Sequence, residues 1–472
     1  MRVLAAFLVN TAFNFAIGLL VAKFLGPDQF GRFALAMAVA MLIQTTTVEW
    51  IRLVAIRFYS ERTRIEEPAL RATLDVTFAI IAVVLAACAI ALMLSGLTFV
   101  LSNALIGIAV GVSVANGLFD YHIALIRARF LDKVYARLVL SKNVLALLLT
   151  VGGAWVAGSA LLALTGACLS MAGSLIFARS ALTDESAKPR LASMERAVEY
   201  ARYALPIVAA NILYLAIAFV NRALVTQHFG FAETGQFSLA FDIGTRLMAA
   251  VGSGLDVLLF QIAVRAQETH GAERAREQVA ANMATVFAIL LPAGVGLWLT
   301  LPSLEQLVVP QEFRGPFGHY LELLLVGMFC FGLMNYAINP IFQIAKTTRP
   351  LIACAIVACI ADGLLILALP ATPDASNFAI AQAGAFTVAM LALLAYAATL
   401  QPVWPRARDI GLAIAGSAAM AAIVYQMRDW PAGVLTLLIQ AATGGAIYAC
   451  FVLAFDIAGL RGQAMKVMRR FV

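Results

Sequence analysis

The sequence is poor in charge and in histidine, and it has no long polar segment. Charged residues make up 12% of the chain, and its four histidines are not spaced as metal ligands. It contains neither a P-loop nor a Gly-x-Ser-x-Gly motif. The longest connector opposite the basic side, residues 301–316, is too short to form a catalytic domain. We therefore expect no enzyme activity, no cofactor and no metal, which argues against a polysaccharide polymerase or a lipid-linked glycosyltransferase.

The cysteines and the basic residues argue against a disulfide framework and against nucleic-acid binding. All six cysteines fall inside apolar runs, which does not suit a disulfide framework, so we interpret them as packing residues. The net charge is +7, but the sequence has no dense run of Lys and Arg with interleaved aromatic residues. Nucleic acid is therefore not an expected partner.

Apolar residues dominate the chain. The sequence is 62% hydrophobic with a mean hydropathy of +0.91, and runs such as residues 75–94 reach the length of about 20 residues that crosses a bilayer. The first run lacks a signal-peptide cleavage pattern and is interpreted as a retained helix. We predict an all-α polytopic membrane protein with about 14 transmembrane helices, at residues 3–24, 31–56, 72–94, 98–126, 134–156, 159–179, 201–225, 235–263, 280–300, 317–344, 351–369, 376–400, 409–426 and 433–456.

The basic residues indicate how these helices are oriented. Most of the 33 Lys and Arg residues follow even-numbered helices or lie at the two ends of the chain, and cytoplasmic loops collect such residues. This pattern includes Arg52 and Lys142, which we assign to cytoplasmic junctions. The prediction is a multi-pass protein with both termini in the cytoplasm. The polar connector 181–200 is then cytoplasmic and is interpreted as a hinge.

A sequence repeat divides the chain. Residues 21–36 read "VAKFLGPDQFGRFALA" and residues 225–240 read "VTQHFGFAETGQFSLA", so that Gly26 and Gly31 recur as Gly230 and Gly235. An even helix offset implies two parallel six-helix repeats around a central cavity, with each repeated turn structural in role. The predicted domains are an N-terminal six-helix bundle, a cytoplasmic linker, a C-terminal six-helix bundle, and two extra helices with a basic tail, at residues 1–180, 181–200, 201–402 and 403–472.

Ionisable and amide side chains within the predicted helices are candidate site residues, because such groups are costly in a bilayer and face a cavity or one another. The helix at 235–263 carries Asp242, Arg246 and Asp256 within one arc, and these either line a cavity or pair to lock helices together. Arg222 either binds substrate or snorkels to the headgroups. Pro340 is expected to kink its helix beside a polar face. The substrate-binding candidates are Arg246, Arg222, Asn14, Asn211, Tyr214, Asn339 and Gln343, and the ion-coupling candidates are Asp242, Asp256, Glu49 and Asp362.

The turn that runs from Leu25 to Phe33 (Leu-Gly-Pro-x-x-Phe-Gly-x-Phe), its repeat, and "NPIFQIAKTTRP" at 339–350 resemble the polysaccharide-biosynthesis flippases of the multidrug/oligosaccharidyl-lipid/polysaccharide exporter superfamily, of the O-antigen and exopolysaccharide (Wzx) type. The resemblance covers about residues 1–400. It implies a protein of the bacterial inner membrane that moves an isoprenoid-pyrophosphate-linked oligosaccharide to the periplasmic leaflet for polysaccharide or lipopolysaccharide biosynthesis. It also implies glycosyltransferases and a polymerase as partners, beside the membrane lipids.

The candidate residues suit that chemistry. Arginine binds phosphate oxygens through a planar fork, and amides and Tyr side chains suit sugars. Acids beside the cations are suited to carry H⁺ or Na⁺. A cation-coupled multidrug exporter of the same superfamily is the alternative function, although a fixed arginine in the cavity favours an anionic substrate.

Overall fold

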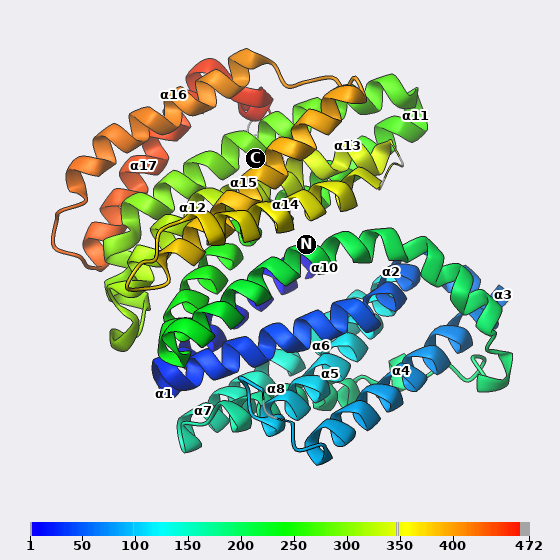
Figure 1. The fold of residues 1–472 in the computed structure, drawn as a ribbon. Helices are drawn as coiled ribbons and strands as arrows, with labels where there is room; N and C mark the ends of the chain where they lie inside the picture. Colours follow the sequence, from blue (N-terminus) through cyan, green and yellow to red (C-terminus); the bar gives the residue numbers. More distant parts are fainter. Residues whose placement is uncertain (1, 98, 346, 348, 463–472) are drawn as a thin grey trace. The chain divides into compact units, whose positions relative to one another are not determined.

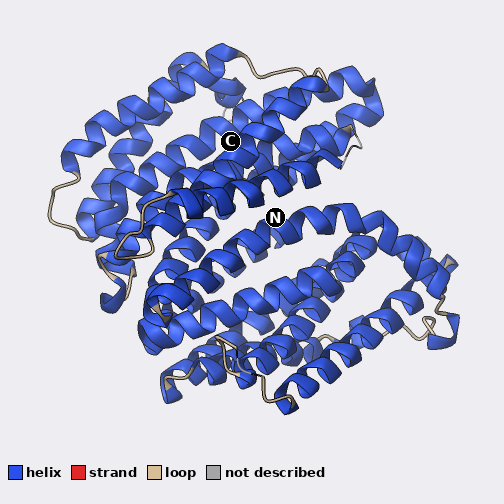
Figure 2. Ribbon diagram, viewed as in Figure 1, coloured by secondary structure: helices blue, strands red, loops and turns tan. Residues whose placement is uncertain are grey.

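The computed structural model describes residues 2–97, 99–345, 347 and 349–462, except for the side chains of residues 2–8, 253, 256–258, 260, 261 and 268. Helices and short connectors make up this part of the chain, which contains no strand (Figure 2). The all-α fold predicted from hydropathy is therefore confirmed. The chain divides into two compact units, Met1–Ser238 and Leu239–Val472. The domain limits suggested by the repeat remain a prediction.

The first unit is built around α1, which packs against α5, α6, α8 and α10 (Figure 1). Its elements include a π-helical turn, η1, between α6 and α7. The helices are α1 (Arg2–Thr47), α2 (Glu49–Phe58), α3 (Glu61–Glu66), α4 (Pro68–Leu94), α5 (Asn103–Ala128), α6 (Asp132–Leu145), η1 (Ala146–Val151), α7 (Gly152–Ala157), α8 (Ala160–Phe177), α9 (Arg179–Leu182), η2 (Pro189–Leu191) and α10 (Met194–Phe229), followed by the start of α11 (Phe231–Val308).

The second unit contains the rest of α11 and a set of long apolar helices. A second π-helical turn, η4, lies between α12 and α13, directly before Pro340. The kink expected at Pro340 stays a prediction, and the structure shows a π-turn directly before that residue. The elements are η3 (Gln311–Phe313), α12 (Pro316–Leu333), η4 (Met334–Ile338), α13 (Asn339–Ile344), α14 (Arg349–Ala368), α15 (Ser376–Thr399), α16 (Ala407–Val424), η5 (Tyr425–Met427), α17 (Val434–Phe455) and η6 (Ile457–Gly459).

Among the described residues, twelve helices are long and apolar enough to cross a membrane. This count does not confirm the predicted number of 14. One of the twelve, Val9–Thr47, overlaps two of the predicted spans, 3–24 and 31–56. The predicted span 235–263 lies in the first part of α11, outside the twelve. The outward faces fit a lipid environment, because Val83 on α4 and Leu438 on α17 are 69% and 60% exposed.

Glycines break the two longest helices. Gly26 interrupts α1 with φ 66 and ψ 174, and Gly271 interrupts α11 with φ 85 and ψ −179. Gly230, which separates α10 from α11, has φ 88 and ψ 179. Gly26 and Gly230 are equivalent in the sequence repeat and share a backbone conformation that glycine adopts readily. The structure thus confirms the predicted turn in both copies.

Ion pairs place three of the predicted cytoplasmic junctions together within the first unit. Arg64 of α3 binds Asp184 of the connector after α9 at 2.9 Å, and Arg129 after α5 binds Glu61 at 2.6 Å. On α4, Arg71 donates to the Leu182 carbonyl at 3.2 Å. The connector predicted to be a hinge is therefore tied to α3 and α4. These contacts agree with the charge pattern, which assigned the junctions to one side of the membrane.

Candidate functional site

A network of polar side chains joins α1 to α5 and to α6 in the first unit, and we group with it an ion pair within α2. Each helix must be apolar over most of its surface to remain in the membrane, so a polar side chain is placed where a neighbouring helix supplies a partner. The network contains Asn10, Asn14, Gln44, Glu49, Arg52, Asn116, Asp120, Lys142 and Asn143.

Gln44 lies at the centre of one part of this network. Its side-chain amide donates to an Asp120 carboxylate oxygen at 3.0 Å, and its carbonyl oxygen accepts from Asn116 at 2.5 Å. Gln44 is 6% exposed, whereas Asp120 is half-buried one turn beyond Asn116 on α5. The buried amide therefore fixes the carboxylate in place while leaving part of it accessible.

A second part of the network is an ion pair on α2. Arg52 donates to both carboxylate oxygens of Glu49 from Nε, at 2.9 and 3.1 Å. The carboxylate is the more enclosed partner, with side-chain exposures of 11% for Glu49 and 34% for Arg52. The guanidinium is thus held by Glu49 and keeps an accessible edge.

Lys142 supplies the second cation. It lies in the third turn of α6, donates to the Asn14 carbonyl oxygen at 3.2 Å and is 5.9 Å from the centre of the Phe119 ring. Asn143, the next residue, is fully buried and donates to Asn10 at 3.0 Å. The assignment of Lys142 and Arg52 to cytoplasmic junctions stays a prediction, and the structure adds a partner for each side chain, Asn14 for Lys142 and Glu49 for Arg52.

The network combines two cations, two carboxylates and several amides. A guanidinium and an ammonium attract phosphate oxygens, while amides suit sugar hydroxyls. Asp120 and Glu49 are acids that H⁺ or Na⁺ would neutralise. The site is thus suited to bind an anion and to respond to a small cation.

Among the predicted residues of the first unit, Asn14 and Glu49 lie in this network, and the others lie elsewhere. Asn211 is exposed and Tyr214 half-buried on α10. Arg222 is 6% exposed, and its guanidinium lies 3.5 Å from the Ala34 carbonyl of α1. That placement, within a contact between two helices, favours a structural role for Arg222.

In the second unit, the structure describes two of the three charged side chains predicted to share one arc of α11. Asp242 is half-buried and Arg246 is exposed, one turn apart on the same helix. The side chain of Asp256 lies outside the described residues. Asp362 of α14 is 4% exposed. The structure leaves the roles of these residues as predictions.

The predicted polar face after the π-turn is only partly accessible. Asn339 donates to Asn335 at 3.3 Å, and its own side-chain oxygen is buried without a hydrogen bond from any described residue. Gln343, one turn further, is exposed. Tyr336, inside η4, packs its ring against Gly252 of α11. A Cβ added to Gly252 would lie 2.1 Å from the Cδ2 atom of Tyr336.

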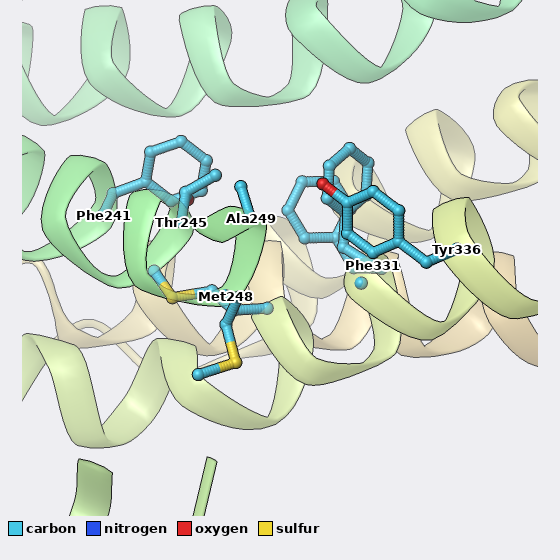
Figure 3. Close-up of a pocket in the computed structure, with 9 residues that line it drawn as sticks. Phe241, Thr245, Met248, Ala249, Phe331 and Tyr336 are labelled. Atoms are coloured by element: carbon cyan, nitrogen blue, oxygen red, sulfur yellow. The ribbon is translucent and has the colours of Figure 1, made fainter. Parts of the chain in front are cut away.

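Tyr336 also lines a small cavity in the second unit. The cavity measures about 30 Å³, and Phe331 and Tyr336 face Phe241, Thr245 and Ala249 of α11 across it (Figure 3). This volume admits one or two water molecules and no larger ligand. We interpret the cavity as a gap in helix packing.

Sequence reasoning missed Asp120, Gln44 and Asn116 as site residues. One signal was present: Asn116 and Asp120 are four residues apart and share a face of α5. Gln44 has a different partner helix, and no periodicity within α1 predicts which helix it will meet.

No family model matches this sequence, and no curated protein matches it. Solved structures match its fold. The structure titled "Lipid II flippase MurJ, inward closed conformation" aligns with a TM-score of 0.70 at 14% identity, over 96% of this chain and 98% of that chain. The chain has the MurJ fold. A multidrug-resistance MATE transporter of the MOP superfamily, in an inward-facing conformation, aligns with a TM-score of 0.59 at 14% identity, over 83% of this chain and 94% of that one. A MATE crystal structure in the bent conformation gives 0.52 at 13% identity, over 89% of this chain and 95% of that one.

Proposed function

We propose that this protein is a flippase that carries an isoprenoid-pyrophosphate-linked oligosaccharide from the cytoplasmic to the periplasmic leaflet. The observation that supports it most directly is the pair of cations, Arg52 and Lys142, within an amide-rich interhelical network. A pyrophosphate needs such cations, and the neighbouring amides suit sugar hydroxyls. The fold shared with a lipid II flippase over 96% of the chain agrees with this substrate class.

In this proposal, the two parallel repeats rock about a central cavity so that it opens to each side in turn. Arg52 and Lys142 attract the pyrophosphate, and Arg246 is a separate candidate for contact with the substrate. The protein lies in the bacterial inner membrane with both termini in the cytoplasm. A cysteine substituted at the exposed Lys188, in a cysteine-free chain, should then react with an impermeant reagent only after the cells are opened.

An acid beside Arg52 links substrate binding to the binding of a small cation. Glu49 pairs with Arg52, so H⁺ or Na⁺ that neutralises this carboxylate releases the guanidinium for the substrate. Substrate binding and cation binding then favour each other, so the two binding equilibria are linked. No bound nucleotide is needed in this scheme.

Flipping in proteoliposomes tests the proposal. Arg52→Ala and Lys142→Ala should each lower the flipping rate of a lipid-linked oligosaccharide at least about tenfold, because a charge-assisted contact is lost. The matched controls are Arg57→Ala and Arg137→Ala, which remove an exposed arginine from the same two helices. Equal rates in the site variants and the controls would refute the assignment.

The alternative function is cation-coupled export of drugs. It is favoured by the two acids and by the likeness to the MATE transporter. A drug exporter should move a cationic dye into the proteoliposomes faster when Arg52 is replaced by Ala, since the competing cation is gone. A flippase should move no dye with or without the substitution.

A further inference from the structure

A cleft in the first unit lies apart from the polar network. It has a volume of about 580 Å³ and is bounded by α4, α5, the end of α8, α9 and the connector that follows. This volume is within the range of about 300–1,000 Å³ that is typical of small-molecule sites. The cleft is therefore large enough for a phospholipid headgroup.

The cleft lies where apolar spans give way to charged connectors. α8 ends at Phe177, and Arg179, which lines the cleft, follows at the start of α9. Just before it, Ile176 and Phe177 are 73% and 61% exposed, as expected of side chains in contact with acyl chains. An arginine directly after such a surface is at headgroup depth.

Opposite charges balance within the cleft. Arg71 pairs with Asp75 at 2.8 Å, and the Asp184 carboxylate is bound by Arg64 at 2.9 Å. Two charges in the lining remain, those of Arg179 and Glu185, and neither forms an ion pair with a residue the structure describes. Both side chains are exposed. The cleft thus offers one cation and one anion to a ligand.

Hydrogen-bond acceptors in the cleft favour an ammonium group that carries hydrogen atoms. His122 lines the cleft and uses Nδ1 to donate to the Leu118 carbonyl at 2.8 Å, so that Nε2 is the acceptor of the neutral ring. Together with Glu185, it supplies acceptors that suit an ammonium group carrying hydrogen atoms. A trimethylated ammonium cannot donate to them.

We propose that this cleft binds the headgroup of a zwitterionic phospholipid with a primary ammonium, such as phosphatidylethanolamine. The phosphate binds Arg179 and the ammonium binds Glu185, while the acyl chains cover Ile176 and Phe177. A pyrophosphate fits less well, because its negative charges would meet Glu185 with only one uncommitted cation. The site is thus separate from the substrate network proposed above.

Lipid retention by the purified full-length protein tests this proposal. The protein in detergent is mixed with equal amounts of phosphatidylethanolamine, phosphatidylcholine, phosphatidylglycerol and an isoprenoid pyrophosphate, and bound lipid is measured by native mass spectrometry. Phosphatidylethanolamine should be retained best. Arg179→Ala and Glu185→Gln should each weaken its binding about tenfold.

Matched controls are Arg190→Ala and Glu195→Gln, which remove exposed charges of the same sign close by without lining the cleft. They should leave retention unchanged. Equal retention of all four lipids, or preferential retention of phosphatidylglycerol or the pyrophosphate lipid, would overturn the proposal. An Arg179→Ala variant that elutes as a folded protein and retains phosphatidylethanolamine as well as the wild type does would also overturn it. Each of these readouts is independent of transport.

Discussion

Gly31 and Gly235 each lie against the backbone of the other copy of the sequence repeat. A Cβ on Gly31 would lie 1.9 Å from the Phe231 carbonyl oxygen, and one on Gly235 would lie 2.1 Å from the Pro27 carbonyl oxygen. Pro27 and Phe231 are themselves equivalent in the repeat. The two turns therefore pack against each other as a two-fold pair, in which each turn contacts the equivalent turn of the other copy.

The close approach predicts that alanine is not tolerated at either glycine. Gly31→Ala or Gly235→Ala forces the two turns apart and should destabilise the protein by at least about 1–3 kcal/mol, as over-packing does. Thermal unfolding of the detergent-solubilised protein measures the loss. Gly152→Ala is the control, since nothing lies within 4 Å of its added Cβ. A melting temperature for Gly31→Ala equal to that of the control would contradict the packing.

The roles of Arg246 and Asp242 are separable by a double substitution. If Arg246 contacts the substrate, Arg246→Ala should abolish flipping in proteoliposomes, and Arg246→Lys should retain part of it because the charge remains without the fork. Arg246→Ala combined with Asp242→Ala should stay inactive while inserting normally. Recovery of full activity in the double variant would instead show that the arginine only neutralises a buried acid.

Acid should release the connector after α9. The hydrogen bond from Arg129 lowers the pKa of Glu61, with burial opposing it and Arg64 adding to it. Burial raises the pKa of Asp184, but hydrogen bonds from Ser186 and from Arg64 outweigh it, and the net pKa is lowered. Carboxylates with lowered folded pKa values stabilise the attachment above their unfolded pKa of about 4 and lose that contribution as pH falls further.

Hydrogen exchange of residues 179–193, corrected for the intrinsic rate, measures this release. Protection should be constant from pH 7 to about pH 4 and should decrease below it. Arg64→Ala should reduce protection already at pH 7, because it removes the contact with Asp184. Protection that increases on acidification would show that the carboxylates do not hold the connector.

The last two helices should be dispensable for insertion. The α16–α17 hairpin covers an apolar face of α11, where Met420 and Val424 pack on Leu299. Arg428 anchors it through an ion pair with Glu322 and by lying 4.6 Å from the centre of the Trp298 ring. Lipid replaces an apolar contact at little cost, so a chain ending after Gln401 should insert and keep part of its flipping activity.

The measurements are abundance in the membrane, elution profile and flipping rate. Arg428→Ala in the full chain is the companion variant, and it should lower the melting temperature without lowering the rate. A complete loss of flipping by a normally inserted truncated protein would place the hairpin in the transport path.

Local properties of the sequence were sufficient for much of the fold. Apolar runs must become helices in a bilayer, since every backbone group needs a partner there, and the predicted helix positions follow from that requirement. The turns at Gly26 and Gly230 were predictable because their conformation depends on the residue itself. The positions of Lys and Arg predict the side of each junction, and the ion pairs of Arg64 and Arg129 bring three of these junctions together.

Only the tertiary structure decided which polar side chains meet. Lys142 lies beside a run of basic residues and looks like a junction charge, yet its partner is Asn14, far away in the sequence. Gln44 and Asp120 likewise lie on different helices. Helical periodicity places a residue on a face of its own helix, but the facing helix is chosen by the packing of the whole unit, which no local pattern contains.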